Sequence, residues 1–519
     1  MIPLLRNAGL ALASGALFAL SFPLTDAFTG LPPFAWMALA PLGLAVLPGR
    51  PRRAFWLGWL AGTTAYLAIL SWVVIVMQTY GHVPAVLSWG LLCLLAAYVG
   101  LYVGLFALGW RWLAARWPHA SWLLAPALWV ALEWLRGQLL SGFPWALFGY
   151  SQYRQLELIQ LAEFTSVYGV SFLLVLVNVG FTYLLLTTMR DPSSPERPAR
   201  PLPRYAPLVA GIVLVAGAVG YGHWRTADIE ASLEPELRVG LIQGNIDQAV
   251  KWDPAMRRET LERYERLTRQ AAAEGAELIV WPEASAPFIF EEEPDYQRAI
   301  RALAAGIKRP LLFGSPAISR DRMGLTNSAY LLNADGATQA RYDKLHLVPF
   351  GEYVPLGPLL GFVNKLVVGI GDFVPGAGPV LMEAAGRPTG VAICFEIIFP
   401  DVVRQSAQHG ARLIVTITND AWFGRSGAPL QHFSMAVFRA IEHRTPVIRA
   451  ANTGISGVIH ATGKIGRTSE LFTEAALVES IATTPIRTVY TRVGDIFAVG
   501  CGILVAFFIM IGRRRKPAA

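Results

Sequence analysis

The sequence has little charge. Lys, Arg, Asp and Glu make up only 15% of its 519 residues, while 54% are hydrophobic. A typical soluble protein has about 25% charged residues. This deficit argues against a wholly soluble chain and indicates a membrane protein with a substantial part outside the bilayer. The net charge of +8 does not predict a nucleic-acid partner, because the basic residues flank apolar runs and form no stripe with interleaved aromatic residues.

Cysteine is scarce as well. The three cysteines are Cys93, Cys394 and Cys501, and two of them lie in long apolar runs, which leaves no disulfide framework. The eight histidines lack the spacing of a zinc site, and no glycine-rich phosphate loop precedes a helix, so no metal, nucleotide or other cofactor is expected. Cys394 differs from the other two because it ends a short β-branched run and is followed two positions later by Glu396. It is therefore a candidate nucleophile.

Long apolar runs are what the sequence has in abundance. A membrane-spanning helix needs about 20 apolar residues, and several runs meet that length. Eight runs occupy residues 8–22, 34–48, 54–77, 84–110, 120–137, 166–189, 206–223 and 491–512. We predict about seven spans in an N-terminal bundle over 1–224, an extramembrane domain over 225–487, and a last span with a basic tail over 488–519.

Arginines support this count because they occur in every second connection between runs. The basic connections hold Arg6, Arg50 to Arg53, Arg111 with Arg116, the arginines of 190–204, and the residues 513–516. The intervening connections 23–33, 78–83 and 138–165 are poor in Lys and Arg. Because cytoplasmic loops carry the excess of Lys and Arg, this alternation predicts cytoplasmic termini and places 225–487 on the outer face.

Segment 225–487 has the pattern of a soluble α/β domain. Short apolar runs predict strands, and amphipathic stretches between them predict helices. The predicted strands are 237–243, 278–281, 311–313, 326–332, 338–342, 391–394, 413–417, 447–451 and 457–460, and the predicted helices are 254–274, 295–307, 400–409 and 430–444. This order favours a mixed sheet covered by helices, with 457–460 as its last strand.

Reactive side chains follow three of these strands. Glu283 lies in 281–285 after a proline that cannot continue a central strand, Lys344 lies in 342–353, and Cys394 lies in 390–400. A carboxylate, an ammonium and a thiol could therefore meet at one sheet edge. Each also has an ordinary alternative, since a lone strand-end Glu or Lys is usually a surface residue and a lone Cys in an apolar strand is usually an inert core residue.

The three stretches together resemble the nitrilase (carbon–nitrogen hydrolase) superfamily, whose Glu-Lys-Cys triad occurs in this chain order. Nearly the whole chain resembles the membrane branch of that superfamily, the apolipoprotein N-acyltransferases, including the stretches 142–145, 243–246 and 251–253. The resemblance implies a polytopic α-helical membrane bundle of about eight spans that carries an α/β nitrilase-type αββα sandwich.

The resemblance also implies roles for individual residues. Glu283 matches the general base, Lys344 the stabiliser of the transition state, and Cys394 the nucleophile that forms a thioester. Glu352 and Glu396 match supporting carboxylates of the family.

Three further positions match the family to different degrees. Trp252 matches a tryptophan near the site, and Asn327 is a looser match. Phe395 stands where a tyrosine can follow the cysteine, so a ring is kept but a hydroxyl is lost, and we expect no proton transfer there.

Three aromatic or apolar stretches could bind substrate. Trp145, in the outer connection, is either part of an interfacial aromatic belt or a wall of a lipid-headgroup site. The Gly-punctuated apolar stretch 356–374, with Phe362, is either a buried core arm or a lid that admits lipid. Trp422 and Arg425 are candidates for a second arm, with Arg425 near a phosphate.

By this resemblance the activity is transfer of an acyl chain from a membrane phospholipid to the free α-amine of the diacylglyceryl-cysteine of an apolipoprotein, at the outer face of the bacterial inner membrane. A membrane-tethered amidase or nitrilase acting on a small amide is the alternative, although one span would suffice as its tether. A scaffold with a degenerate domain would be expected to lack at least one of Glu283, Lys344 and Cys394, and all three are present.

Overall fold

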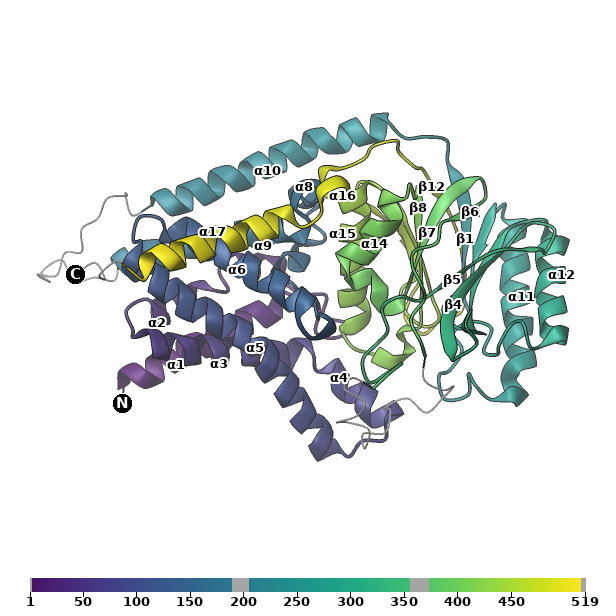
Figure 1. Ribbon diagram of the computed structural model, residues 1–519, viewed down its shortest axis with the longest axis horizontal. Coiled ribbons are helices and arrows are strands. Elements are labelled where there is room, and N and C mark those ends of the chain that lie inside the picture. Colours follow the sequence, from purple (N-terminus) through teal and green to yellow (C-terminus); the bar gives the residue numbers. More distant parts are fainter. Residues whose placement is uncertain (1, 189–204, 355–372, 515–519) are drawn as a thin grey trace, which may run out of the picture.

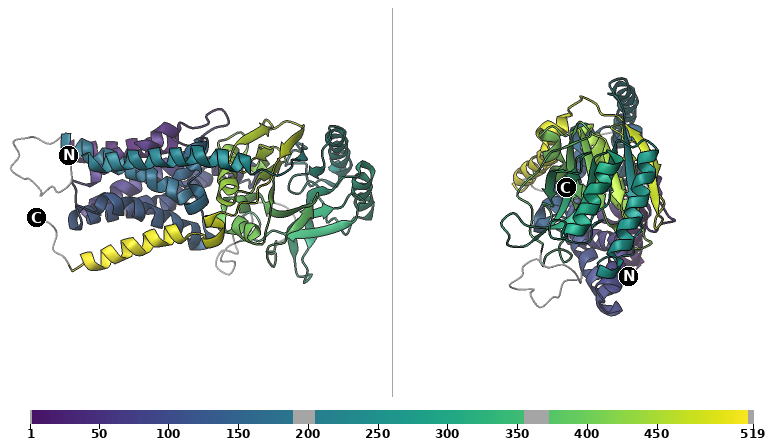
Figure 2. Two further views of the ribbon diagram at one scale, coloured as in Figure 1. Left: turned by 90° about the horizontal axis from the view of Figure 1, so that it is seen from above. Right: turned by 90° about the vertical axis from the view of Figure 1, so that its right-hand side faces the viewer.

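The structure is a computed structural model that describes residues 2–188, 205–354 and 373–514. It consists of a helical bundle and an α/β sandwich that lie end to end (Figures 1 and 2). The N-terminus and the end of the last helix lie at the end of the bundle that faces away from the sandwich.

Helices occupy all eight of the predicted apolar runs. The bundle contains α1 (Ile2–Leu20), η1 (Pro32–Trp36) with α2 (Ala40–Val46), α3 (Pro51–Ile69), α4 (Trp72–Ile75) with η2 (Val76–Tyr80), α5 (Ala85–Arg116), α6 (Ser121–Gln138), α9 (Val167–Thr188), α10 (Ala206–Ala231) and α17 (Ile496–Gly512). The connection between α6 and α9 folds into the short elements η3 (Leu139–Ser141), η4 (Phe148–Gln152), α7 (Leu156–Ile159) and α8 (Ala162–Thr165).

Fewer than eight of these helices are long and apolar enough to cross a membrane on their own. Among the described residues, α5, α9 and α10 meet that standard, and α3 with the α4–η2 segment would make a fourth across a bend of 51°. The apolar helices Leu4–Leu20, Pro32–Val46 and Ile496–Gly512 are shorter. A 17-residue helix spans only about 25 Å, less than a hydrocarbon core of about 30 Å. The prediction of eight spans is therefore confirmed only in its helices and not in its number of crossings.

Glycines let α3 and α5 approach each other closely. Gly58 and Gly62 on α3 face Val103, Gly104 and Ala107 on α5. A Cβ atom on Gly58 would lie 2.5 Å from the Cβ of Ala107, which real side chains do not tolerate. Small residues four apart are typical of helix contacts within membranes, where close packing drives association.

The sandwich contains two six-stranded sheets. The first has the order β12-β1-β2-β3-β4-β5 and the second the order β11-β10-β9-β8-β7-β6. The strands are β1 (Leu237–Gln243), β2 (Leu278–Val280), β3 (Leu311–Ile318), β4 (Leu325–Leu332), β5 (Thr338–Asp343), β6 (Met382–Ala384), β7 (Arg387–Ile393), β8 (Leu413–Thr418), β9 (Val447–Ala451), β10 (Gly457–Ile459), β11 (Ile465–Thr468) and β12 (Ala475–Ile481).

The sandwich has the αββα layers that the resemblance implied. Helices α11 (Arg257–Ala273) and α12 (Pro294–Ile307) cover the first sheet, and α14 (Pro400–Gln408) and α15 (Ala428–His443) lie between the second sheet and the bundle (Figure 1). Along β1, Val239 and Leu241 belong to the core between the sheets, while Ile242 packs with the core under α11 and α12. Strands buried on both faces explain why these runs are almost continuously apolar.

The strand pattern predicted one mixed sheet that ends at residue 460, and this was wrong. Two sheets are present, and β6, β11 and β12 were missed. β11 is a partly exposed strand with the polar sequence Ile-Gly-Arg-Thr, and β12 is only partly buried. β12 becomes a strand because it pairs antiparallel with β1, Leu237 lying opposite Ile481. That long-range pairing has no local sequence signal.

The connections poor in Lys and Arg all contact the sandwich. The Gln431 side chain of α15 donates to the Pro23 carbonyl oxygen at 2.6 Å and accepts from the Trp145 indole at 2.6 Å, and the Tyr80 hydroxyl donates to the Ala421 carbonyl oxygen at 2.8 Å. Among the described residues, Arg111 of one basic connection bonds the Gly49 carbonyl oxygen of another at 2.6 Å, and Arg116 bonds the Gly512 carbonyl oxygen at the end of α17 at 2.6 Å. These three described basic connections therefore lie near the end of α17, at the end of the bundle that faces away from the sandwich (Figure 1).

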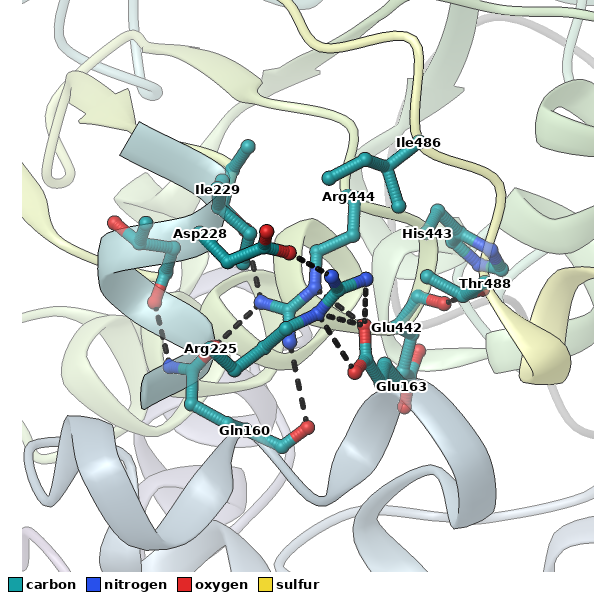
Figure 3. Close-up of polar contacts among 12 residues, drawn as sticks. Gln160, Glu163, Arg225, Asp228, Ile229, Glu442, His443, Arg444, Ile486 and Thr488 are labelled. Atoms are coloured by element: carbon teal, nitrogen blue, oxygen red, sulfur yellow. Dashed lines mark hydrogen bonds and ion pairs between the residues drawn. The ribbon is translucent and has the colours of Figure 1, made fainter. Parts of the chain in front are cut away.

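A buried ion cluster joins the bundle to α15 (Figure 3). Glu163 of α8 accepts from Arg225 of α10, at 3.0 Å, and from Arg444 at the end of α15, at 2.9 Å. Tyr221 of α10 also bonds Glu163, and Arg444 additionally reaches the side chain of Gln160. Glu163 and Arg444 are almost fully buried, so the two parts are held together by paired charges as well as by apolar packing.

Candidate active site

Each of the three candidate catalytic residues lies just past the end of a strand. Glu283 follows β2, Lys344 follows β5, and Cys394 follows β7 at the start of η6 (Cys394–Ile398). Cys394 has φ = 53°, and Ala284, next to Glu283, has φ = 47°. Left-handed backbone at a residue other than glycine costs about 1–2 kcal/mol and is typically retained where a side chain must be presented in a special direction.

Lys344 lies between two carboxylates. Its Nζ is 2.9 Å from Glu352 Oε1 and 3.7 Å from Glu283 Oε1. Asn327 of β4 donates from Nδ2 to the same two oxygens, at 2.7 Å to Glu283 and 2.9 Å to Glu352. The ammonium and the amide therefore hold two like charges close together at one site.

The electrostatics of this site give Lys344 and Cys394 definite protonation states. Burial lowers the pKa of Lys344, but the neighbouring Glu352 and Glu283 outweigh it and hold that pKa well above its usual range. Burial, followed by the Glu283 carboxylate, raises the pKa of the Cys394 thiol far above its usual range. The resting site thus contains a charged lysine and a neutral thiol, and the thiol needs a base before it can attack.

Glu396 supports the site from behind. It is fully buried, and its carboxylate accepts from the backbone N–H of Ile393 at 2.6 Å, of Leu345 at 2.6 Å and of His346 at 3.1 Å. The Tyr342 hydroxyl donates to it at 2.9 Å. One carboxylate therefore ties the turn that carries Cys394 to the loop that carries Lys344.

These groups open into one mainly apolar cavity of about 210 Å³. Its polar lining includes Glu283, Asn327, Lys344, Glu352 and Cys394. Its apolar walls come from both parts of the molecule and include Trp72 and Val76 of the bundle, Trp145 of the connection between α6 and α9, and Trp252, Phe395, Trp422 and Phe423 of the sandwich. The Cys394 thiol therefore lines an apolar pocket where the bundle meets the sandwich.

Most of the residues singled out in the sequence meet at this cavity. Phe395, Trp252, Asn327, Trp145 and Trp422 all line it. Asn327 does more than the sequence suggested, since its amide bridges the two carboxylates.

Two residues of the sequence analysis are not among the described residues that line the cavity. Arg425 is not part of the cavity wall as the described residues define it; it pairs with Asp26 at 3.4 Å, and its guanidinium lies 5.2 Å from the ring of Phe472. Its contact with a phosphate stays a prediction. Phe362 and most of the stretch 356–374 lie outside the described residues, although Phe373, near the end of that stretch, lines the cavity.

Several site residues were missed. Trp72 and Val76 read as ordinary parts of an apolar run, and only the bend after α3 brings them to the cavity. Lys251 precedes Trp252 in the stretch 251–253 that resembles the family, but it was not predicted to belong to the site. Its Nζ donates to the Glu283 carbonyl oxygen at 3.0 Å, and burial lowers the pKa of Lys251 to about 8. His432 of α15 lines the cavity and was indistinguishable in the sequence from other helix residues.

Comparisons with known proteins find relatives that match this chain over nearly its whole length. Residues 14–180 match the family model for the apolipoprotein N-acyltransferase N-terminal domain, and residues 238–487 match the model for carbon–nitrogen hydrolase. A protein of Geobacter metallireducens named apolipoprotein N-acyltransferase is 46% identical over 98% of this chain and 96% of its own length. A protein of the same name from Methylococcus capsulatus is 35% identical over 98% and 97%.

Solved structures are more distant. An amidase from Nesterenkonia sp. is 19% identical, covers 51% of this chain and 95% of its own, and has a TM-score of 0.38. The assignment of a family depends on the sequence matches alone.

Proposed function

We propose, because the chain belongs to the apolipoprotein N-acyltransferase family, that it transfers an acyl chain from a membrane phospholipid to the free α-amino group of the diacylglyceryl-cysteine at the N-terminus of an apolipoprotein. The observation that carries this proposal is the cavity, in which Cys394, Lys344 and Glu283 lie under walls supplied partly by the bundle. An acyl chain can occupy such a pocket with its carbonyl at the thiol.

In the first half-reaction Cys394 attacks the ester carbonyl of the phospholipid. Glu283 takes the thiol proton, and the oxyanion of the tetrahedral intermediate is stabilised by the Lys344 ammonium and the backbone N–H of Phe395. Each such donor is typically worth about 2.7–4 kcal/mol. The intermediate collapses to a thioester, and the departing lysophospholipid oxygen receives the proton from Glu283.

In the second half-reaction the α-amine of the lipoprotein attacks the thioester carbonyl. Glu283 takes a proton from the amine, the same donors stabilise the second oxyanion, and the Cys394 sulfur leaves and regains a proton. Two steps through one covalent intermediate constitute a ping-pong mechanism.

The remaining site residues have supporting roles in this proposal. Glu352 holds Lys344 charged, and Glu396 orients the turn of Cys394 against the loop of Lys344. Trp252, Trp145, Trp422 and Asn327 contribute to the substrate-binding wall, and Phe362 and Arg425 remain predicted contacts for lipid.

An amidase for a small soluble amide is a weaker candidate. Such an enzyme would not require a cavity lined by Trp72 and Trp145, and it would not explain why residues 14–180 match the N-terminal domain of the acyltransferase family. The apolar lining of the cavity therefore favours a lipid acyl donor.

The proposal includes the membrane topology. We infer eight crossings by the eight helical segments, a division of the chain at 224/225 and 487/488, and a position in the bacterial inner membrane with the sandwich on the outer face. Support comes from the contacts of the Lys/Arg-poor connections with the sandwich and from the bonds that join the described basic connections near Gly49, Arg111 and Gly512 to one another.

Intact-mass spectrometry of the protein from membranes tests the mechanism. We expect an acyl adduct that hydroxylamine releases, that is absent in Cys394→Ala, and that persists in Cys93→Ala, which removes an exposed thiol on α5. A wild-type protein that turns over lipopeptide without ever carrying the adduct would contradict the thioester.

A further inference from the structure

His432 of α15 contacts the main chain of the nucleophile. Its Nε2 lies 3.1 Å from the carbonyl oxygen of Cys394, and the side chain is fully buried. A carbonyl oxygen only accepts hydrogen bonds, so Nε2 must carry the proton. The imidazole therefore donates to the peptide unit that joins Cys394 to Phe395.

The other ring nitrogen faces a buried ion pair. His432 Nδ1 is 3.0 Å from Arg449 Nη2 and 3.2 Å from Asp420 Oδ1, and Arg449 Nη2 is 2.7 Å from Asp420 Oδ2. Arg449 can donate one proton to the ring and another to the carboxylate, which leaves Nδ1 as an acceptor. Burial, with Arg449, lowers the pKa of His432, in agreement with a neutral ring that is protonated at Nε2.

Asp420 and Arg449 are themselves held firmly. Thr418 donates to Asp420 Oδ1 at 2.9 Å, and the Arg449 Nε donates to the Ile455 carbonyl at 3.2 Å. A Cβ atom on Gly454 would lie only 2.2 Å from Asp420 Oδ2, so the backbone closes directly on the carboxylate. The ring consequently has one defined tautomer and one defined place.

The contact with the Cys394 carbonyl also fixes the direction of the next N–H group. A peptide unit is planar, and in the trans form its C=O and N–H point in opposite directions. Anchoring the Cys394 oxygen on the α15 side therefore turns the Phe395 N–H away from α15. Cys394 has φ = 53°, a left-handed conformation that is unfavourable for a residue other than glycine. Contacts with the rest of the protein, such as the one from His432, are therefore needed to hold this turn.

We propose that His432 is a positioning residue that keeps the Cys394–Phe395 peptide unit in the orientation in which the Phe395 N–H donates to the oxyanion, with Arg449 and Asp420 selecting the tautomer that makes this bond. The inference rests on the proposed function in so far as that function uses a backbone oxyanion donor. His432 does not touch the substrate carbonyl in this scheme.

The test compares four purified full-length proteins in detergent. His432→Leu removes the donor, His432→Gln keeps an N–H donor at a similar reach, and His443→Leu is the matched control. His443 is a second buried histidine of α15, whose Nδ1 bonds Thr491 instead of the nucleophile. The readouts are the burst of p-nitrophenolate from a short-chain p-nitrophenyl ester, which reports acylation of Cys394, and the rate at which iodoacetamide alkylates Cys394.

We expect His432→Leu to lower the maximal burst rate by about 10–100-fold, less than the loss of an oxyanion donor outright, with little change in the half-saturating ester concentration. His432→Gln should recover most of that rate, and His443→Leu should retain it. Alkylation of the thiol should stay close to wild type in all four proteins, because iodoacetamide forms no oxyanion. If His432→Leu does not fold, His432→Asn, which is too short to reach the carbonyl, is expected to give the same loss.

Two results would overturn the inference. One is a burst rate for His432→Leu that equals that of the control, and the other is a parallel loss of burst and alkylation, which would show that His432 acts on the thiol itself. Transfer to a synthetic diacylglyceryl lipopeptide is measured separately on the wild type. A wild-type protein that gives the burst without this transfer contradicts the proposed function. The role of His432 is then still decided by the burst rates of its variants.

Discussion

Glu352→Gln is the most informative single change at the site. Glu352 Oε1 accepts from Lys344 Nζ and from Asn327 Nδ2, both at 2.9 Å, and Oε2 accepts from the Val348 N–H at 2.8 Å. Glutamine has one acceptor oxygen in place of two. Whichever way its amide turns, its NH₂ group faces a donor, and Lys344 loses its nearer counter-charge.

The magnitude follows from that loss. Losing an oxyanion donor raises the barrier by about 2.7–4 kcal/mol, and we take the lower part of that range because Glu283 remains 3.7 Å from Lys344. Burial then lowers the pKa of Lys344 with less opposition, so less of the lysine is charged when the oxyanion forms. A loss of about 3 kcal/mol corresponds to a fall of roughly 10²-fold in the rate of acylation.

The assay is a single turnover with phospholipid, followed by intact-mass measurement of acylated Cys394 against time. Glu291→Gln is the matched control, because Glu291 pairs with Arg341 at 3.3 Å at a partly exposed position where an ion pair contributes about 0–1 kcal/mol. We expect the control to acylate within a few-fold of wild type. Acylation of Glu352→Gln at the rate of the control would refute the reasoning that Glu352 maintains the charge of Lys344.

Three further predictions concern the surroundings of the site. The acylation rate of the wild type should fall above about pH 8, because Lys251 there loses the positive charge that favours the Cys394 thiolate. The pH profile of Lys251→Met should lack this fall, and a fall that persists in the variant would show that another group titrates. Trp72→Ala should raise the KM for phospholipid about tenfold with little change in kcat, since it removes about 1–2 kcal/mol of apolar contact from the cavity wall, and an unchanged KM would exclude Trp72 from the binding site. Arg444→Met should lower the free energy of unfolding by about 3 kcal/mol, which is the lower end for a broken buried pair because Arg225 still neutralises Glu163. The inactivation temperature in detergent should therefore be lower for Arg444→Met than for the exposed-site variant Arg258→Met, and equal temperatures would contradict the prediction.

Local patterns were enough to predict most of the helices and strands and the strand-end positions of the catalytic candidates. Glu283 and Cys394 were found because a proline and a β-branched run mark where their strands end, and both facts are local. The αββα architecture came from resemblance, and β12 was missed because its partner β1 lies more than two hundred residues earlier in the chain. Pairing over such distances leaves no trace in a short window of sequence.

The least predictable part of the site was the wall that comes from the bundle. Trp72 reaches the cavity because the chain bends by 51° after α3, and the apolar sequence of this run gives no sign of a bend. The roles of Asn327 and His432 depend on contacts between separate elements, which only the three-dimensional arrangement provides. Sequence therefore indicated the catalytic candidates and their supporting carboxylates, while the contacts among them emerged from the structure.

The pairing of β1 with β12 has a consequence for how the chain is made. β1 follows α10 directly, but β12 is synthesised only when almost the whole sandwich has been completed, shortly before α17. During this interval β1 leaves an edge of the first sheet uncovered, and such an edge is a template for aggregation. A nascent chain that stops before residue 475 therefore leaves the sheet open, while a chain that continues closes it just before its last helix emerges. Completion of the domain and delivery of that helix are in this way nearly simultaneous events.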